Sequence, residues 1–243
     1  MKEKIYTIPI NEAIEENSFC PFCSIYRRLE NEAVEYTLGA AMMEPDFRMI
    51  TNENGFCQKH IRDLHAESKA LSLALVMDTH MEEINRLFEI NMKDSKKSIL
   101  KKGGSEKNSF VSGLKRILNS CAVCMRIEHT LNRYFETFVY MLRTEKDFLE
   151  KVLSIEGFCM EHFSKLAEVA LTELSDKNFK ELFLPVVELQ KNRLKKYQTY
   201  IKNFADQFNY SNAGKKLDAP KDILYKTAEL LNGEFESPMT SLT

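Results

Sequence analysis

The chain has 243 residues, of which 44% are hydrophobic and 29% are charged, and its formal net charge is −2 at pH 7. This length is enough for one large domain or two small ones, and the composition is ordinary for a soluble globular protein. The near-zero charge excludes an overall basic field, so nucleic acid is not an expected partner. Eight glycines and six prolines are few for this length, which favours long helices over a β-sandwich or barrel.

The first 18 residues, MKEKIYTIPINEAIEENS, carry charges throughout and lack the apolar stretch of a secretory signal. The longest unbroken apolar run near the middle of the chain, LALVM at 73–77, is far too short to cross a bilayer. We therefore expect a cytoplasmic protein without membrane insertion. In that reducing compartment its six cysteines are expected to be metal ligands or reactive thiols rather than disulfides.

Apolar residues recur at steps of three and four after each Cys-x-x-Cys motif, and this spacing predicts two helices with one apolar face each. The first stripe runs from Ile25 to Met43 and the second from Ile127 to Met141. The Asn-Ser pairs just before each motif, at 17–18 and 119–120, are typical of helix N-caps. A short segment and then a glycine follow each helix.

Further along the chain, a long helix is predicted from Cys57 to about Leu100, and another from Cys159 to about Phe208. Pro185 is the place where the second could kink. A short C-terminal helix is predicted over 223–231. No stretch alternates convincingly with a period of two, so the predicted fold class is all-α.

The chain also contains a duplication. Cys20-Pro-Phe-Cys23 is matched 101 residues later by Cys121-Ala-Val-Cys124, and Cys57-Gln-Lys-His60 is matched 102 residues later by Cys159-Met-Glu-His162. Further matched pairs are Asn31 and Asn132, Glu35 and Glu136, Glu44 and Glu145, Asp46-Phe47 and Asp147-Phe148, Gly55-Phe56 and Gly157-Phe158. We therefore predict tandem helical metal-binding repeats within 1–100 and 109–210, a linker at 101–108, and a tail at 211–243 that holds the short helix.

Each half holds three thiols and one imidazole, which together make a closed tetrahedral zinc set. Residues i and i+3 at the start of a helix lie on one face, so both reach one ion, and the helix N-terminus favours a thiolate over a thiol. The glycine before each Cys-x-x-His allows a sharp turn. The predicted ligands of two zinc ions per chain are Cys20, Cys23, Cys57, His60, Cys121, Cys124, Cys159 and His162.

Three alternatives stay open at this point. Three cysteines and one histidine also hold iron–sulfur clusters. The Cys-x-x-Cys motifs could be redox pairs, although the Cys-x-x-His motifs would then lack an explanation. We expect each site to lie within one half, because a single ancestral unit would need a complete site. The alternative is a crossed arrangement, in which the Cys-x-x-Cys of one half meets the Cys-x-x-His of the other.

The motifs resemble a bacterial and archaeal family of unknown function. Its members carry a CPxC-type start and a GFCxxH motif, often in two copies. The similarity covers about 17–210, and the second copy departs from it at Ala122, where the family pattern has proline. The resemblance implies metal binding and no particular activity.

The sequence carries no HExxH, GxSxG, P-loop or GxGxxG motif, so an enzyme is not favoured and no catalytic residue is assigned. The favoured hypothesis is a zinc-binding helical protein with two structural sites that serves as an interaction or regulatory module, with a protein partner or a second copy of itself. The alternative is a redox-active or thiol-sensing protein, or an iron–sulfur protein, that uses the same residues.

Overall fold

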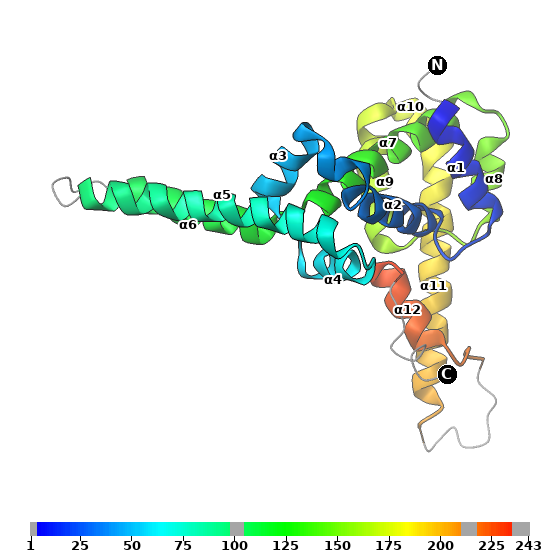
Figure 1. Ribbon diagram of the computed structural model, residues 1–243. Helices are drawn as coiled ribbons and strands as arrows, with labels where there is room; N and C mark the ends of the chain where they lie inside the picture. Colours follow the sequence, from blue (N-terminus) through cyan, green and yellow to red (C-terminus); the bar gives the residue numbers. More distant parts are fainter. Residues whose placement is uncertain (1–3, 98–104, 210–217, 235–243) are drawn as a thin grey trace. The chain divides into compact units, whose positions relative to one another are not determined.

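The computed structural model describes residues 4–97, 105–209 and 218–234, except for the side chains of Lys4, 90–97 and 105–109. All regular secondary structure in these residues is helical (Figure 1). The predicted all-α fold class is therefore confirmed. Within the same residues, no helix combines the length and the apolar character that crossing a membrane requires.

Contacts divide the chain into two compact units. The central unit comprises Arg28–Thr130, and the terminal unit combines Met1–Arg27 with Leu131–Thr243. The boundaries fall inside two long helices, α2 (Pro21–Thr37) and α7 (Ala122–Thr144), so each of these helices contributes residues to both units. The units therefore do not follow the predicted halves, since each one takes segments from both.

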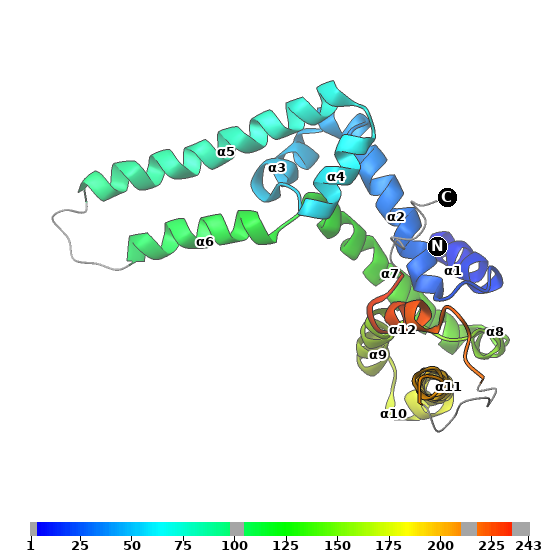
Figure 2. The same ribbon diagram turned by 90° about the horizontal axis from the view of Figure 1, so that it is seen from below.

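The central unit is built around a helical hairpin. Helices α5 (Ala70–Lys97) and α6 (Ser105–Asn119) lie side by side (Figure 2), and the rings of Phe88 and Phe110 meet edge to face with centroids 5.0 Å apart. The remaining elements of this unit are the 3-10 turn η1 (Ala40–Met43), α3 (Pro45–Asn54) and α4 (Gln58–Ala66). Helix α3 packs against both members of the hairpin.

The predicted single helix from Cys57 to Leu100 is wrong, because α4 ends at Ala66 and α5 begins at Ala70. Ser68 between them has a φ of 55°, which belongs to the left-handed region and stops a right-handed helix. Residues 98–100 lie outside the described residues. Part of the predicted linker, 105–108, is the start of α6, a helix that the sequence reading missed, and 101–104 are not described.

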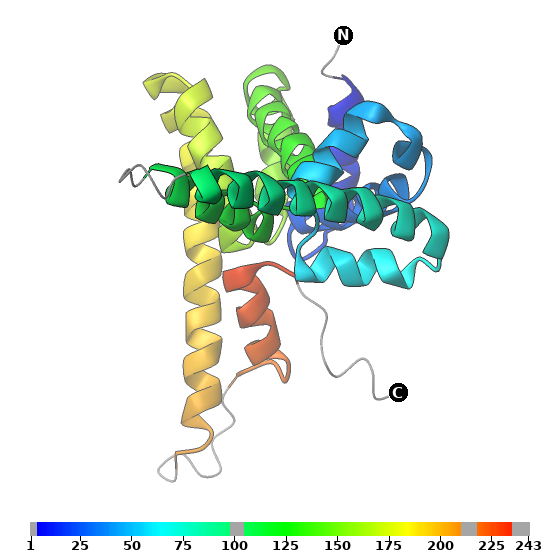
Figure 3. The ribbon, with the colours of Figure 1, turned by 60° about the vertical axis from the view of Figure 1, so that its left-hand side comes forward.

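The terminal unit has an aromatic core. Its helices are α1 (Lys4–Glu15), α8 (Phe148–Ser154), α9 (Met160–Glu173), α10 (Asp176–Asn178), the π-turn η3 (Phe179–Phe183), α11 (Leu184–Asp206) and α12 (Ile223–Asn232). The fully buried aromatic residues are Phe22, Phe135, Phe138, Phe148, Phe158 and Phe183. Helix α12 lies along α11 (Figure 3), where Ile223 and Leu230 pack against Tyr197.

The second long helix is also interrupted, and earlier than Pro185. Leu174 is extended, with a ψ of 138°, and Ser175 caps the next turn by accepting a hydrogen bond from the Asn178 amide at 3.3 Å. Pro185 is the second residue of α11, directly after the π-turn, where its missing N–H costs little. The predicted C-terminal helix is confirmed as α12, whereas α1 was not predicted.

Candidate metal centres

The structure gathers all eight predicted ligands into two clusters. Site A contains Cys20, Cys23, Cys159 and His162, and site B contains Cys57, His60, Cys121 and Cys124. In each cluster one atom per residue lies within 4.8 Å of all the others. Each site combines the Cys-x-x-Cys of one half with the Cys-x-x-His of the other. The expectation that each half holds its own site is therefore wrong, and the crossed arrangement is found. Site A lies within the terminal unit and site B within the central unit.

The spacing of the ligand atoms in site A suits a single tetrahedral ion. His162 Nδ1 lies 3.2 Å from Cys159 Sγ, 3.4 Å from Cys23 Sγ and 3.7 Å from Cys20 Sγ. The sulfur atoms of Cys23 and Cys159 are 3.7 Å apart. Tetrahedral zinc with ordinary bond lengths places two sulfurs about 3.8 Å apart and a sulfur and a nitrogen about 3.6 Å apart.

Site B has nearly the same dimensions. His60 Nδ1 lies 3.3 Å from Cys57 Sγ, 3.3 Å from Cys121 Sγ and 3.2 Å from Cys124 Sγ. The sulfur atoms of Cys57 and Cys124 are 3.9 Å apart. The two sites are therefore built alike, with three sulfurs and one Nδ1 around a common centre.

Each site joins the N-termini of two helices, as the sequence predicted. Cys57 and Cys159 are the N-caps of α4 and α9, with extended backbone at ψ 166° and 159°. Cys20 and Cys121 directly precede α2 and α7. The i+3 ligand of every motif then falls in the first helical turn, on the same face as the first. Four helix N-termini thus direct their positive ends toward thiolates.

Glycine is required at the turn before each Cys-x-x-His. Gly55 and Gly157 have φ values of 60° and 121°, which side-chain-bearing residues rarely adopt. A Cβ at Gly55 would lie 2.4 Å from His80 Nε2, and a Cβ at Gly157 would lie 2.9 Å from Gln190 Oε1. Side chains of α5 and α11 therefore pack directly against the turns that precede Cys57 and Cys159.

A backbone hydrogen bond holds the crossed segments together in site B, where the Ala122 amide donates to Gly55 O at 2.9 Å. The Ser120 hydroxyl also lies 3.0 Å from Asn54 O, although its shorter contact is with Arg116 O at 2.7 Å. Proline at position 122 would lack the N–H that makes the bond to Gly55 O. The residue that departs from the family-like pattern thus contributes to the pairing of the two halves.

In site A, where Pro21 occupies the matching position, the turn is held differently. The Gln190 side chain accepts from the Phe158 amide at 3.0 Å and donates to Phe158 O at 2.9 Å. Gln190 is buried, so water does not compete for these hydrogen bonds and the low local dielectric strengthens them. This two-point contact fixes the residue immediately before Cys159.

The thiols in each site cannot all ionise without a compensating cation. In site A, hydrogen bonds from Cys20 and Cys23 hold the pKa of Cys159 well below its ordinary value. Burial, and then the bond to Cys159, raises the pKa of Cys20 to about 12. In site B, hydrogen bonding from Cys124 lowers the pKa of Cys121 to about 3, whereas that of Cys124 is raised by its bond to Cys121. A divalent ion removes this conflict, because thiolates bind it directly.

Glu30 orients the histidine of site B. Its carboxylate lies 3.0 Å from His60 Nε2, so the Nε2–H donates to Glu30 and leaves the Nδ1 lone pair for the metal. Lys59 Nζ also lies 2.5 Å from Glu30 Oε1. Burial alone would raise the pKa of Glu30, but the bonds from His60 and Lys59 lower it. Sequence reasoning missed Glu30, since Leu131 occupies the matching position and the repeat gives no signal.

We expect the substitution Glu30→Ala to weaken metal binding at site B by about 10- to 100-fold, the usual effect of removing a carboxylate behind a ligand histidine. Site A should keep its affinity. A competition titration with a chromogenic chelator measures both. Glu32→Ala is the matched control, because Glu32 is exposed on the same helix. Equal affinities for the two variants would contradict the role of Glu30.

Aromatic rings surround the histidine of site A, and the segment after α12 covers the site. The ring of His162 lies among those of Phe22, Tyr26 and Phe135, with centroids 6.1, 6.2 and 6.1 Å away. After α12, the Glu234 amide donates to Cys23 Sγ at 3.5 Å, and the Glu234 carboxylate pairs with Arg27. The sequence predicted the last helix but not its place beside the site.

Arg193 is a buried cation that bridges the two ligand-bearing segments of site A. Its side chain is 2% exposed, and its guanidinium carbon lies 4.1 Å from the centroid of the Phe19 ring, next to Cys20. Its aliphatic part lies against Gly157, two residues before Cys159. Its ion pair with Glu156 is long, at 4.0 Å. Arg193 therefore packs against both segments that carry the ligands of site A.

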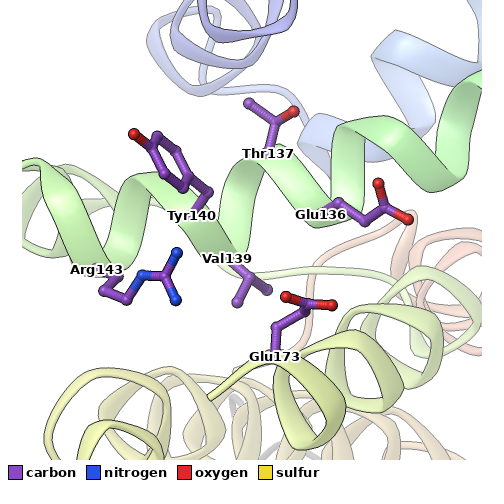
Figure 4. Close-up of a pocket in the computed structure, with 6 residues that line it drawn as sticks. All are labelled: Glu136, Thr137, Val139, Tyr140, Arg143 and Glu173. Carbon is purple, nitrogen blue, oxygen red and sulfur yellow. The ribbon is translucent and has the colours of Figure 1, made fainter. Parts of the chain in front are cut away.

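The terminal unit also has a pocket lined by side chains from α7 and α9 (Figure 4). Glu136, Arg143 and Glu173 supply its charged groups, and Tyr140 and Val139 its apolar surface. The Thr137 hydroxyl is already committed to Arg133 O at 2.7 Å. The lining contains neither cysteine nor histidine, so it is not a further site of the same kind.

The fold and the two clusters define an all-helical protein with two Cys₃His sets capable of binding metal. Residues 1–238 match the model of a family described as a family of unknown function (DUF6062), and the chain belongs to that family. No curated protein and no solved structure matches the chain.

Proposed function

We propose that the chain binds two zinc ions, one in site A and one in site B, and that both ions have a structural role. The observation that carries this proposal is the closed set of four protein ligands at each centre. Structural zinc sites use four such ligands in a tetrahedron, whereas catalytic zinc keeps one position open for water or substrate. The distances among the cysteine sulfurs and the histidine nitrogen of each site also suit the bond lengths of a zinc ion.

The short distances between sulfurs favour one ion over an iron–sulfur cluster. A cluster distributes its cysteine ligands over several iron atoms and so holds some of them farther apart than one ion does. Here the four ligand atoms of each site lie within 4.8 Å of one another. A mononuclear ion therefore fits both centres better than a cluster does.

The proposed biological role is a non-enzymatic interaction or regulatory module in the cytoplasm. All six cysteines are free of disulfides, which suits a reducing compartment. Large apolar side chains are exposed on the central unit, as at surfaces that contact other proteins. Those on α3 and α5 are Met49, Ile50, Leu71, Leu75, Met77, Met81 and Phe88.

The decisive experiment is the metal content of untagged protein purified without added metal, together with an absorption spectrum of the same sample. We expect about two zinc ions per chain and no visible absorption. Iron with inorganic sulfide and a brown colour would replace zinc by a cluster. Metal-free protein with six titratable thiols would refute metal binding altogether.

A further inference from the structure

The two sites differ in how far their ligand residues are exposed. All four ligands of site A are buried. In site B, His60 and Cys121 are buried, but Cys57 and Cys124 are only partly buried. Site A is also covered by aromatic rings and by the Gly233–Glu234 backbone, whose atoms lie against Cys23 and Cys159. A small solute therefore has easier access to Cys57 and Cys124 of site B than to any ligand of site A.

We propose that Cys57 and Cys124 form a site of reversible oxidation, at which a peroxide converts the two thiolates to a disulfide and releases the metal ion of site B. The metal ion of site A is retained under the same conditions. This inference rests on the proposed occupancy of both sites by zinc and assigns a regulatory chemistry to one of them.

Exposure selects this pair of thiols, and the distance between their sulfurs permits a bond. Their sulfur atoms are 3.9 Å apart, and forming a bond of about 2 Å requires a movement of about 2 Å, which release of the ion permits. Cys121 is the third thiol of the site, but it is 4% exposed and accepts a hydrogen bond from the Cys124 amide at 3.5 Å. Access for the oxidant is thus greatest at Cys57 and Cys124.

The reaction balances with peroxide as the oxidant. One thiolate attacks the O–O bond, which breaks to give a sulfenic acid and, with one proton, a water molecule. The second thiolate attacks the sulfenic sulfur, forming the S–S bond and, with another proton, releasing a second water. Two sulfurs lose one electron each, and the two peroxide oxygens gain them. Site B keeps only Cys121 and His60, so the ion leaves.

Oxidation changes how the start of α4 is linked to the start of α7. In the metal-bound state four ligands around one ion join these helix starts, together with the bond from the Ala122 amide to Gly55 O. After oxidation the Cys57–Cys124 disulfide keeps them linked, but His60 and Cys121 are released from the ion. The central unit, which also carries the exposed apolar residues of α3 and α5, is then held at this point by one covalent bond in place of four metal ligands.

The test uses the full-length, zinc-loaded protein and hydrogen peroxide, with released zinc followed by a chromogenic chelator. We expect one of the two zinc ions to be released and a disulfide between the peptides that carry Cys57 and Cys124. Dithiothreitol with added zinc should restore the starting state. Glu30→Ala should release its zinc several-fold faster, because it weakens site B without changing a thiol, and Glu32→Ala should behave like the unmodified chain.

Release of no zinc, release of both ions together, or a disulfide among Cys20, Cys23 and Cys159 would overturn the inference. A disulfide between Cys121 and Cys124 would also overturn it. The starting zinc content separates this failure from that of the proposed function. Fewer than two zinc ions before oxidation refutes the proposed function, and the inference falls with it. Two zinc ions that resist peroxide refute the inference alone.

Discussion

Removing Cys20 together with Cys159 should leave one bound zinc ion per chain, whereas removing Cys20 together with Cys57 should leave none. The first pair belongs to site A alone, and the second pair takes one ligand from each site. A site with three ligands retains little affinity in the presence of a competing chelator. The double variants C20A/C159A and C20A/C57A share the first substitution and differ only in which second cysteine is removed, so they serve as controls for each other. Metal analysis after dialysis against the chelator gives the result.

A single variant provides an independent check if a double variant fails to fold. In Cys20→Ala, the crossed arrangement predicts that Cys23 and Cys159 become reactive toward a maleimide, while the three thiols of site B stay protected by metal. Mass spectrometry of the labelled peptides identifies them. Labelling of Cys23 and Cys57 instead would mean that each half holds its own site, in contradiction to the structure.

Removal of both metal ions should unfold much of the region around the sites. Structural zinc contributes about 10 kcal/mol or more to the stability of small zinc domains, and a whole domain is stable by only about 5–15 kcal/mol. Without the metal, the buried ligand thiols must either carry negative charges close to one another or stay protonated without a bond to the ion, and both states are less stable. Hydrogen exchange should accelerate most at the starts of α2, α4, α7 and α9, which the two sites join.

Thermal unfolding followed by far-UV circular dichroism measures the overall effect of chelation, and adding zinc back should restore the original transition. The C-terminal turns of α11, beyond Tyr197, provide an internal reference in the exchange experiment, because the contacts of this helix with site A come from Gln190 and Arg193. These turns contribute no ligand and pack against α12. An apo-protein with an unchanged melting temperature and unchanged exchange would show that the clusters do not stabilise the fold.

The interruption of both long helices shows where local sequence patterns reach their limit. Ser68 and Leu174 lie within stretches whose apolar spacing is compatible with continuous helix, yet both adopt non-helical backbone. Intrinsic helix propensity is weak beside tertiary packing. Helices α1 and α6 were also missed, since α1 contains Pro9 in its interior and α6 begins within the stretch predicted to be a linker.

The chemistry of the sites, in contrast, was set by the sequence itself. The ligand types, their i and i+3 spacing and the glycine before each Cys-x-x-His follow from bonding geometry at a helix start, which is local. The all-α class follows from composition and periodicity in the same way. Whether the duplicated motifs descend from one ancestral unit stays a prediction.

Only the tertiary structure decided which motif meets which. The two Cys-x-x-Cys motifs, and likewise the two Cys-x-x-His motifs, offer the same donor atoms, so sequence alone cannot rank the two pairings. Contacts between distant segments do rank them, such as those of Ala122 with Gly55 and of Phe22 with Phe158. Glu30 and Gln190, which orient His60 and the turn before Cys159, likewise lie at positions that no local sequence pattern identifies. Pairing depends on the packing of the whole chain, because identical ligands carry no information about their partners.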